Sequence, residues 1–398
     1  MFGVAEFRAL WVAQLLSVIG DQLARVALTV LVYDRTRSAL LAAITFVVSI
    51  VPTFVGGLTL AWLADRYPRR AVMIACDLAR CALVLIMAIP GLPLGGLVGL
   101  LFLVTLVGAP FTSARAAVYP DVLEGEKYVT GTAVTLTTFQ FAQVIGFAAG
   151  GTIVGFFGIR PSLLIDAATF LASGLIVRAW VRSRPAPVTV ARQDGKPRRL
   201  AGLIAGTRLV FGHHVLRTTM LFGWLAAFYN APEGVVTPLA RALGGGALAV
   251  GMILAAQALG ETIGVIVFSR FVLPAARLRF MGPLAFGTCA ILVLFLCRPG
   301  LLLSLLILSA SGVCASYQLA ANAAFVRAAP HERRSQAFGL AQGGMSLGQG
   351  MVMILAGAAA DHHSPALVIS VCGAVGAVLA LVITLNWLRD RGQPGDVR

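Results

Sequence analysis

Long apolar runs, separated by short charged or Pro/Gly-rich segments, dominate the chain. A helix of about 20 apolar residues is long enough to cross a bilayer. The runs cover residues 10–33, 39–63, 71–89, 94–114, 131–157, 161–181, 215–240, 246–269, 280–297, 301–326, 336–359 and 366–388. The pattern therefore predicts an all-α integral membrane protein with twelve transmembrane helices.

The composition supports a membrane protein. Of 398 residues, 59% are hydrophobic and 12% are charged, and the mean hydropathy is +0.89. Soluble domains are about 45–50% apolar and about 25% charged, so a cytosolic enzyme, a secreted domain, a coiled coil and a disordered protein are excluded. The six cysteines lie in apolar stretches without a C-x-x-C pair. We therefore expect no disulfide framework, no metal site and no cofactor.

The Lys and Arg residues are concentrated in the segments between the apolar runs. If the N-terminus is inside, 24 Lys and Arg fall in inner loops and termini and five fall in outer loops. Cytoplasmic loops carry such an excess, so we expect a multi-pass protein of the inner (plasma) membrane with both termini cytoplasmic. The net charge of +15 is explained in this way, and we expect no nucleic-acid partner.

The chain also divides in the middle. We expect an N-terminal six-helix half at 1–181, a cytoplasmic linker at 182–214 and a C-terminal six-helix half at 215–398. The two halves share a weak repeat. Its matching positions, 206 residues apart, are Glu126-Lys127 with Glu332-Arg333, Gln143 with Gln349, and Gly151 with Gly357. Parallel repeats of this kind are typical of transporters that bind substrate between two halves.

The inner loop after the second run carries a recognisable motif. It reads Leu63-Ala64-Asp65-Arg66-Tyr67-Pro68-Arg69-Arg70. This segment resembles the D-R-x-G-R-R signature of the major facilitator superfamily, with Pro68 at the glycine position. The resemblance implies a gating role for Asp65, Arg66, Arg69 and Arg70 at the inner face. The alternative is that these arginines only fix the topology.

The fifth run carries a second motif, Ala142-Gln143-Val144-Ile145-Gly146-Phe147-Ala148-Ala149-Gly150-Gly151. It resembles the G-x-x-x-G-P-x-x-G-G signature of antiporter branches of the superfamily, with Phe147 at the proline position. Small residues let helices approach closely. Packing and bending both remain open as roles for this segment.

Further segments narrow the resemblance. They are Leu10-Trp11-Val12-Ala13-Gln14, Asp77-Leu78-Ala79-Arg80, Ala114-Arg115-Ala116, Pro120-Asp121 and Asp166-Ala167-Ala168-Thr169-Phe170. Together they resemble the branch of the superfamily that contains the enterobactin exporter and macrolide efflux proteins. The resemblance covers nearly the whole chain and is strongest in residues 8–180. It implies export of a mid-sized organic compound in exchange for protons.

Ionisable residues inside membrane helices indicate functional sites. Asp21 and Arg25 are four residues apart, so one face of the first helix carries both. An i,i+4 pair of opposite charges can neutralise itself. The pair is either a proton-coupling site, with Asp21 as the protonatable acid, or a structural pair that fixes helix packing.

Other polar residues in the runs are further candidates for substrate binding or proton coupling. Glu261 has no basic residue within one helical turn, and an apolar surrounding favours the neutral form of such a carboxyl group. Asn230 and Glu233 flank Pro232 in the seventh run and indicate a cavity wall or an outer gate. Gln143 is an uncharged candidate for the cavity. Each of these residues could equally serve helix packing.

Two further groups of charges are interpreted as structural. Asp77 and Arg80, three residues apart, are expected to belong to a structural inner clamp, with Arg115 as a neighbour. Asp166, about one turn inside the sixth run, is expected to be a structural residue at the helix start or at the outer rim.

These observations favour a secondary transporter that works by alternating access. No G-x-x-x-x-G-K-[ST] motif is present, so proton antiport is the simplest source of energy. The expected partners are a small organic substrate, protons and membrane lipids, and the expected state is a monomer. A lipid or lysophospholipid transporter and a solute importer are the alternatives. An enzyme or a receptor is disfavoured, because no catalytic cluster or output domain is evident.

Overall fold

The computed structural model describes residues 2–60, 62–184, 207, 209–330 and 333–391, and every regular element in these ranges is a helix. The chain forms two compact units. Unit 1 comprises Met1–Gln193 and Ala240–Ala255, and unit 2 comprises Asp194–Leu239 and Ala256–Arg398. The division expected from the sequence assigned 240–255 to the second half, whereas these residues pack with unit 1. Most of the expected linker lies outside the described residues.

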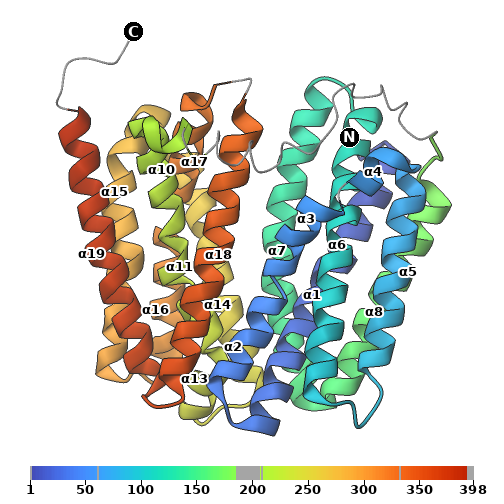
Figure 1. Ribbon diagram of the computed structural model, residues 1–398, viewed down its shortest axis with the longest axis horizontal. Helices are drawn as coiled ribbons and strands as arrows, with labels where there is room; N and C mark the ends of the chain where they lie inside the picture. The colour runs from blue at the N-terminus through green and yellow to red at the C-terminus, as the bar shows by residue number, and fades with distance from the viewer. Residues whose placement is uncertain (1, 61, 185–206, 208, 331–332, 392–398) are drawn as a thin grey trace. The chain divides into compact units, whose positions relative to one another are not determined.

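Unit 1 is a bundle of helices drawn from blue to green in Figure 1. Its helices are α1 (Ala5–Thr36), α2 (Ala39–Val48), α3 (Val51–Thr59), α4 (Trp62–Arg66), α5 (Arg69–Met87), α6 (Leu94–Val122), α7 (Glu126–Phe157) and α8 (Ile159–Trp180). Helix α8 packs against both α1 and α5, and α1 also packs against α7. Side chains from the first, third and sixth apolar runs therefore meet inside this unit.

Unit 2 is helical as well. Its helices, two of which begin or end in unit 1, are α10 (His214–Trp224), α11 (Ala226–Tyr229), α12 (Ala231–Gly234), α13 (Val236–Ala242), α14 (Ala247–Phe271), α15 (Pro274–Ala290), η1 (Ile291–Cys297), α16 (Leu301–Cys314), α17 (Tyr317–Ala328), α18 (Arg334–Ala360) and α19 (Pro365–Arg391). Close packing uses glycine: a Cβ atom on Gly312 of α16 would lie 2.8 Å from the backbone nitrogen of Glu261 on α14.

The predicted all-α membrane fold is confirmed. In the described part of the chain, ten helices are long and apolar enough to cross a membrane. The third and seventh expected spans are not among these ten, and each departs from a continuous apolar helix. Helix α5 begins with two arginines and carries Asp77 and Arg80 in its middle. The seventh span is divided into α10, α11, α12 and α13, with Pro232 in the first turn of α12, where proline has no N–H to continue the hydrogen-bond ladder.

The small residues of the fifth run pack as their pattern predicts. A Cβ atom on Gly146 of α7 would lie 2.9 Å from the Cβ atom of Gln22 on α1. One on Gly150 would lie 3.2 Å from the Cα atom of Leu23. Any larger side chain at these positions would push the two helices apart. Helix α7 is continuous through Phe147, the position where the related signature has proline.

Candidate functional site

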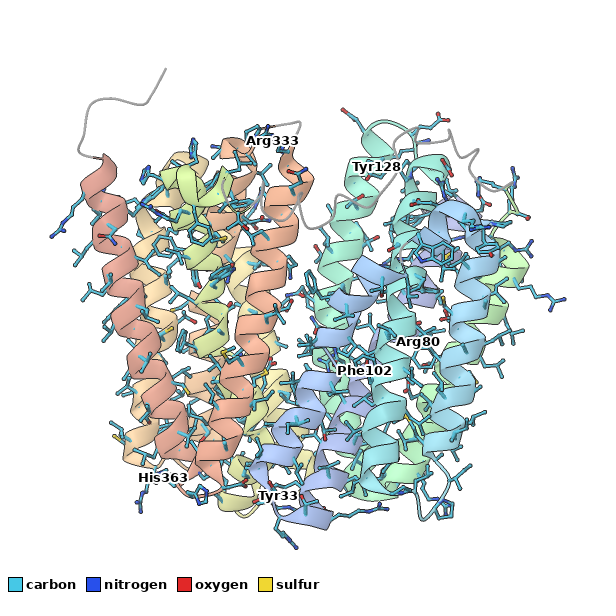
Figure 2. The ribbon with its side chains drawn as sticks, in the orientation of Figure 1. Tyr33, Arg80, Phe102, Tyr128, Arg333 and His363 are labelled. Carbon is cyan, nitrogen blue, oxygen red and sulfur yellow. The ribbon has the colours of Figure 1, made fainter. Side chains whose placement is uncertain are left out.

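A cavity of about 550 Å³ lies inside unit 1. Helices α1, α5, α6, α7 and α8 contribute to its lining, together with Ser49 and Thr53 from the second run. Its charged lining residues are Asp21, Arg25, Arg80, Arg115 and Asp166. Tyr128, also in the lining, lies at one end of the unit, and Arg80 lies about half-way along its helices (Figure 2). The cavity lining therefore runs from one end of the bundle past the middle of its helices, as far as Met87 at the end of α5.

An ion pair between α1 and α5 forms part of the wall of this cavity. Nη2 of Arg80 donates to Oδ1 of Asp21 at 2.5 Å, and the Arg80 side chain is only 6% exposed. The guanidinium carbon of Arg80 also lies 3.9 Å from the ring centroid of Phe170 on α8. Gly108 of α6 leaves room for this group, because a Cβ atom there would already be 3.5 Å from it. Arg80 of α5 is thus enclosed by α1, α6 and α8.

Asp77 has a different partner from the one that helical spacing predicts. Its Oδ2 atom accepts a hydrogen bond of 2.6 Å from Oγ of Ser173 on α8, and both residues are fully buried. Arg80, the expected i+3 partner, makes its ion pair with Asp21. Arg115 is near enough to Asp77 for their charges to interact, as the sequence led us to expect. The part of these residues in an inner clamp stays a prediction.

Arg25 points toward the second run and α7. Its Nη2 atom donates to the carbonyl oxygen of Ser49 at 3.2 Å. Its guanidinium carbon lies 5.3 Å from the ring centroid of Phe46 and 6.0 Å from that of Phe147. Spacing along α1 predicted Asp21 as its partner, but the ion pair that the structure shows for Asp21 is made with Arg80. Spacing within one helix could not reveal a partner 59 residues away.

Gln143 takes part in a chain of amides beside the cavity. Nε2 of Gln22 on α1 donates to Oε1 of Gln143 at 3.1 Å, and Nε2 of Gln143 donates to Oε1 of Gln140 at 3.2 Å. These bonds join α1 to α7 while Gln143 still borders the cavity. Gln143 can therefore serve both helix packing and substrate contact.

Asp166 is the site residue that sequence reasoning missed. We expected a structural residue near a helix start, but the side chain is 0% exposed and borders the cavity. Asp21 and Arg80 lie close enough for charge interactions with it. Within the described residues, neither of its carboxyl oxygens has a hydrogen-bond donor in bonding geometry. Asp166 lies one turn before Phe170, but nothing in this spacing indicates that α8 turns the carboxyl group toward Arg80.

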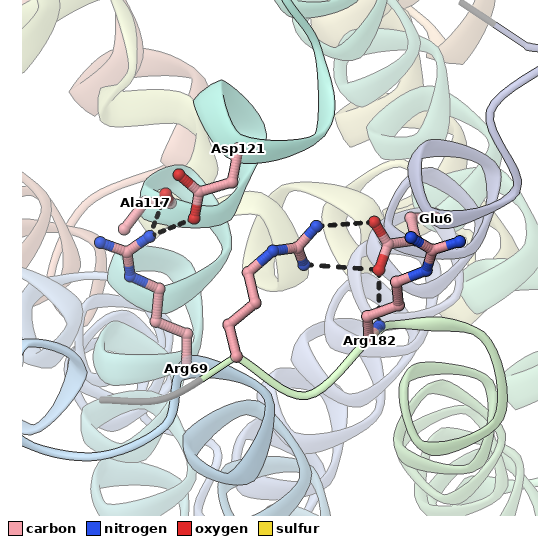
Figure 3. A network of polar contacts seen from close by, with 6 residues as sticks. Glu6, Arg69, Ala117, Asp121 and Arg182 are labelled. Carbon is pink, nitrogen blue, oxygen red and sulfur yellow. Dashed lines mark hydrogen bonds and ion pairs between the residues drawn. The ribbon is translucent and has the colours of Figure 1, made fainter. Parts of the chain in front are cut away.

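The loop motif that resembles the superfamily signature makes its contacts through its last two arginines. Nη1 of Arg69 donates to Oδ2 of Asp121 at 2.6 Å and to the carbonyl oxygen of Ala117 at 2.8 Å, both at the end of α6 (Figure 3). Arg70 donates to the backbone carbonyl of Arg178 near the end of α8. Asp65 and Arg66 are exposed. The gating role of all four motif residues remains a prediction.

A second contact ties the start of α1 to the segment after α8. Nη2 of Arg184 donates to Oε2 of Glu6 at 2.8 Å, and the backbone N–H of Arg182 donates to Oε1 of Glu6 at 2.6 Å. Figure 3 shows this contact near the pair formed by Arg69 and Asp121. The ends of α1, α6 and α8 and the start of α5 are thus held by polar contacts at one end of unit 1.

The candidates in unit 2 form a separate group. Nε2 of Gln257 on α14 donates to Oδ1 of Asn230 at 2.8 Å. Glu261 follows Gln257 by one turn of α14, and Glu233 lies in the short helix α12. Asn230 and Glu233 lie where the seventh span is broken, as expected for residues flanking Pro232. Substrate or proton binding by these residues stays a prediction.

Unit 2 also contains a smaller cavity of about 390 Å³. Its polar lining residues are Thr219, Gln318, Asn322 and Gln342. None of the residues that line it carries a charge. It therefore offers fewer means to bind a proton or a charged substrate than the cavity of unit 1.

Comparison with known proteins gives a consistent result. The family description "Major Facilitator Superfamily" matches residues 10–239 and 230–398. The chain is 26% identical over 269 residues to the enterobactin exporter EntS of Shigella boydii, an alignment that covers 65% of this chain and 62% of that protein. It is 25% identical over 187 residues to the MFS-type transporter YkuC of Bacillus subtilis, covering 45% and 42%. The alignments therefore span less than two thirds of these relatives.

Solved structures agree on the fold. A peptide transporter POT in complex with alafosfalin has a TM-score of 0.75 at 15% identity, with 98% of this chain and 96% of that chain covered. An inward-facing bacterial homologue of the lysosomal transporter Spinster has a TM-score of 0.70 at 14% identity, with 98% of each chain covered. The helical bundles, the cavity with its ionisable lining and the match along almost the whole sequence lead to one assignment: the chain belongs to the Major Facilitator Superfamily of membrane transporters.

Proposed function

We propose that this transporter exports a small to mid-sized organic compound, such as a drug, a siderophore or a secondary metabolite, in exchange for protons. It would work by alternating access in the inner (plasma) membrane, with both termini in the cytoplasm. The observation that carries the proposal is the cavity of about 550 Å³ with charged groups in its lining. Pockets for drug-sized compounds have volumes of about 300–1,000 Å³, so the cavity has room for an organic substrate.

The residues divide into three proposed roles. Asp21 and Glu261 would take up and release the coupling proton, since membrane-embedded acids mark proton pathways. Arg25, Gln143, Asn230 and Glu233 would contact the substrate. The inner face would be gated by Asp65, Arg66, Arg69, Arg70, Asp77, Arg80 and Arg115. Proton uptake needs to change the relative stability of the two access states by only a few kcal/mol.

The similarity to enterobactin exporters supports a siderophore or a compound of similar size as the substrate. A lysophospholipid is the main alternative cargo. The charged lining of the unit 1 cavity favours a substrate with polar or charged groups, because an unpaired charge beside acyl chains is costly.

Everted membrane vesicles, in which export becomes uptake, test this function. Enterobactin, erythromycin and a fluorescent lysophospholipid serve as probes, with vesicles that lack the transporter as the control. We expect uptake of an organic probe that depends on an acidic vesicle interior and is lost in Asp21→Asn, while exchange of that probe without a pH gradient survives. Uptake of the lysophospholipid alone would favour the alternative cargo. Probe movement that is independent of the pH gradient would rule out proton antiport as the mechanism.

A further inference from the structure

We propose that Asp166, a residue not included in the coupling site above, holds a proton behind the Asp21–Arg80 ion pair and releases it through Asp21. The structure assigns this role through a juxtaposition of three helices: the acid of α8, the arginine of α5 and the acid of α1 meet at one wall of the unit 1 cavity. The use of this proton rests on the proposed antiport function, whereas its binding does not.

The surroundings of Asp166 favour its protonated form. The side chain is 0% exposed, and the neighbouring hydroxyl group of Thr169 donates to the backbone carbonyl oxygen of Asp166, at 2.7 Å, instead of to the carboxyl group. A buried carboxylate without donors is strongly disfavoured relative to its neutral acid. Arg80, a cation whose charge interacts with Asp166, is already paired with Asp21 at 2.5 Å. One arginine cannot neutralise both acids at once.

The other acids nearby are less suited to hold an exchangeable proton. Asp77 accepts a hydrogen bond from Ser173 and is not among the residues that line the cavity. Asp21 lines the cavity and is 36% exposed, but it is paired with Arg80. Only Asp166, in the described part of this cluster, combines a place at the cavity wall with carboxyl oxygens that lack donors.

Charged and titratable groups face Asp166 from the helices around it. From α1 it faces Asp21, with Arg25 one turn further along that helix, and from α5 it faces Arg80 and Cys81, while Asp77 interacts with Arg80 and Asp21. Helix α6 adds Arg115 to the same cavity, and α7 contributes the uncharged Gln143. Arg25 interacts with Ser49 and two aromatic rings, and Arg115 interacts with Asp77. Arg80 is therefore the cation best placed to stabilise an ionised Asp166.

These positions define a proton-transfer step. The O–H bond of Asp166 breaks as an O–H bond forms on Asp21, and the guanidinium group of Arg80 moves from Asp21 to the newly ionised Asp166. The total charge of the three residues stays the same. Asp21, which is partly exposed in the cavity, then loses the proton to water. The ion pair thereby acts as a barrier between Asp166 and water until Arg80 moves.

Infrared spectroscopy of the purified full-length transporter tests the inference without a substrate. Only protonated carboxyl groups give the C=O stretching band of a carboxylic acid. We expect Asp166→Asn to remove one such band at neutral pH, and Asp166→Glu to change its frequency. Asp121→Asn, which removes an exposed acid, is the matched control and should leave all these bands unchanged. If Asp166→Asn fails to fold, the Asp166→Glu spectrum decides alone.

A second variant tests the contribution of Arg80. Arg80→Gln should keep the Asp166 band up to a pH about one unit or more higher, because the ionised acid loses its cation. The proposal would be overturned if the spectra of Asp166→Asn and Asp166→Glu both match that of the wild type in this region. It would also be overturned if the band disappears only in Asp21→Asn. If Asp166 is protonated but no probe moves with a pH gradient, the antiport function fails and the proton site stands.

Discussion

Asp21 of α1 pairs with Arg80 of α5, with 2.5 Å between Oδ1 and Nη2, although another basic residue, Arg25, lies one turn further along α1. The Arg80 end of this pair is buried, with 6% of its side chain exposed. The pair connects two helices of unit 1 through residues that are 59 positions apart in sequence. It is therefore both a structural contact and part of the cavity wall.

Removal of the Asp21 charge should destabilise the transporter through Arg80. Asp21→Asn removes the ion-pair partner of the buried Arg80 guanidinium group, which then has Asp166 and Asp77 as nearby acids. The loss of one partner of a buried pair costs about 3–5 kcal/mol. Since Asp21 is partly exposed to the cavity, we expect a loss toward the lower end of that range. Thermal unfolding of the purified protein in detergent measures the effect.

Two double variants identify the partner. Asp21→Asn with Arg80→Gln should recover most of the lost stability, because neither charge remains, whereas Asp21→Asn with Arg25→Gln should recover little. Recovery in the second double variant and not in the first would mean that Arg25 is the energetically important partner of Asp21.

The ion pair between Arg69 and Asp121 should affect access to the unit 1 cavity more than it affects the stability of the protein. Its two side chains are 26% and 40% exposed, and exposed ion pairs contribute about 0.2–1 kcal/mol. We expect Asp121→Asn to change the stability within that range and to raise the reaction rate of a cavity cysteine with a membrane-impermeant maleimide. Thr132→Cys, placed in the cavity lining, supplies that cysteine in a protein whose six native cysteines are serine.

Asp65→Asn is the matched comparison for this experiment. Asp65 is an exposed acid of the same loop motif, and the structure shows Arg69 in contact with Asp121 instead. If Asp65→Asn accelerates labelling more than Asp121→Asn does, the gate depends on Asp65, and the Arg69–Asp121 contact is incidental.

The sequence was sufficient for the fold and insufficient for the partners inside it. Apolar runs report the length and position of helices, and the small residues of α7 indicated a close helix approach, which the structure shows between Gly146 and Gln22. The partners of Asp21 and Asp77 could not be found in the same way. Both lie on other helices, and spacing along a single helix contains no information about which helices become neighbours. Asp166 was overlooked for the same reason, since its importance depends on the packing of α8 against α1 and α5.

The expected topology can be checked with a native cysteine. Cys297 is exposed at the end of η1, whereas Cys76, Cys81 and Cys289 are buried. If the N-terminus is cytoplasmic, Cys297 lies at the outer face, next to the outer-loop residue Arg298. A membrane-impermeant maleimide should then label intact cells that express the wild type, and Cys297→Ser should abolish this labelling. Labelling of everted vesicles but not of intact cells would reverse the orientation.

The packing of α1 against α8 at Gly20 gives a test of the geometry around Asp166. A Cβ atom on Gly20 would overlap both Oδ1 of Asp166 and Oγ1 of Thr169. Gly20→Ala should therefore lower the stability by about 1–3 kcal/mol, the usual cost of overpacking. Gly99→Ala on α6 is the matched control, because a Cβ atom there meets nothing within 4 Å. It should be neutral or up to about 1 kcal/mol stabilising.

A compensating change makes this prediction specific to the contact. Thr169→Ala removes one of the two atoms that the new methyl group would meet, so Gly20→Ala with Thr169→Ala should be more stable than the sum of the two single changes predicts. Because residues in contact typically couple by about 0.5–3 kcal/mol, thermal unfolding of the four proteins in the cycle can resolve the effect. Additive changes across the cycle would show that α1 and α8 do not approach at Gly20 as the structure has them. The surroundings described for Asp166 would then have to be redrawn, because they depend on this approach.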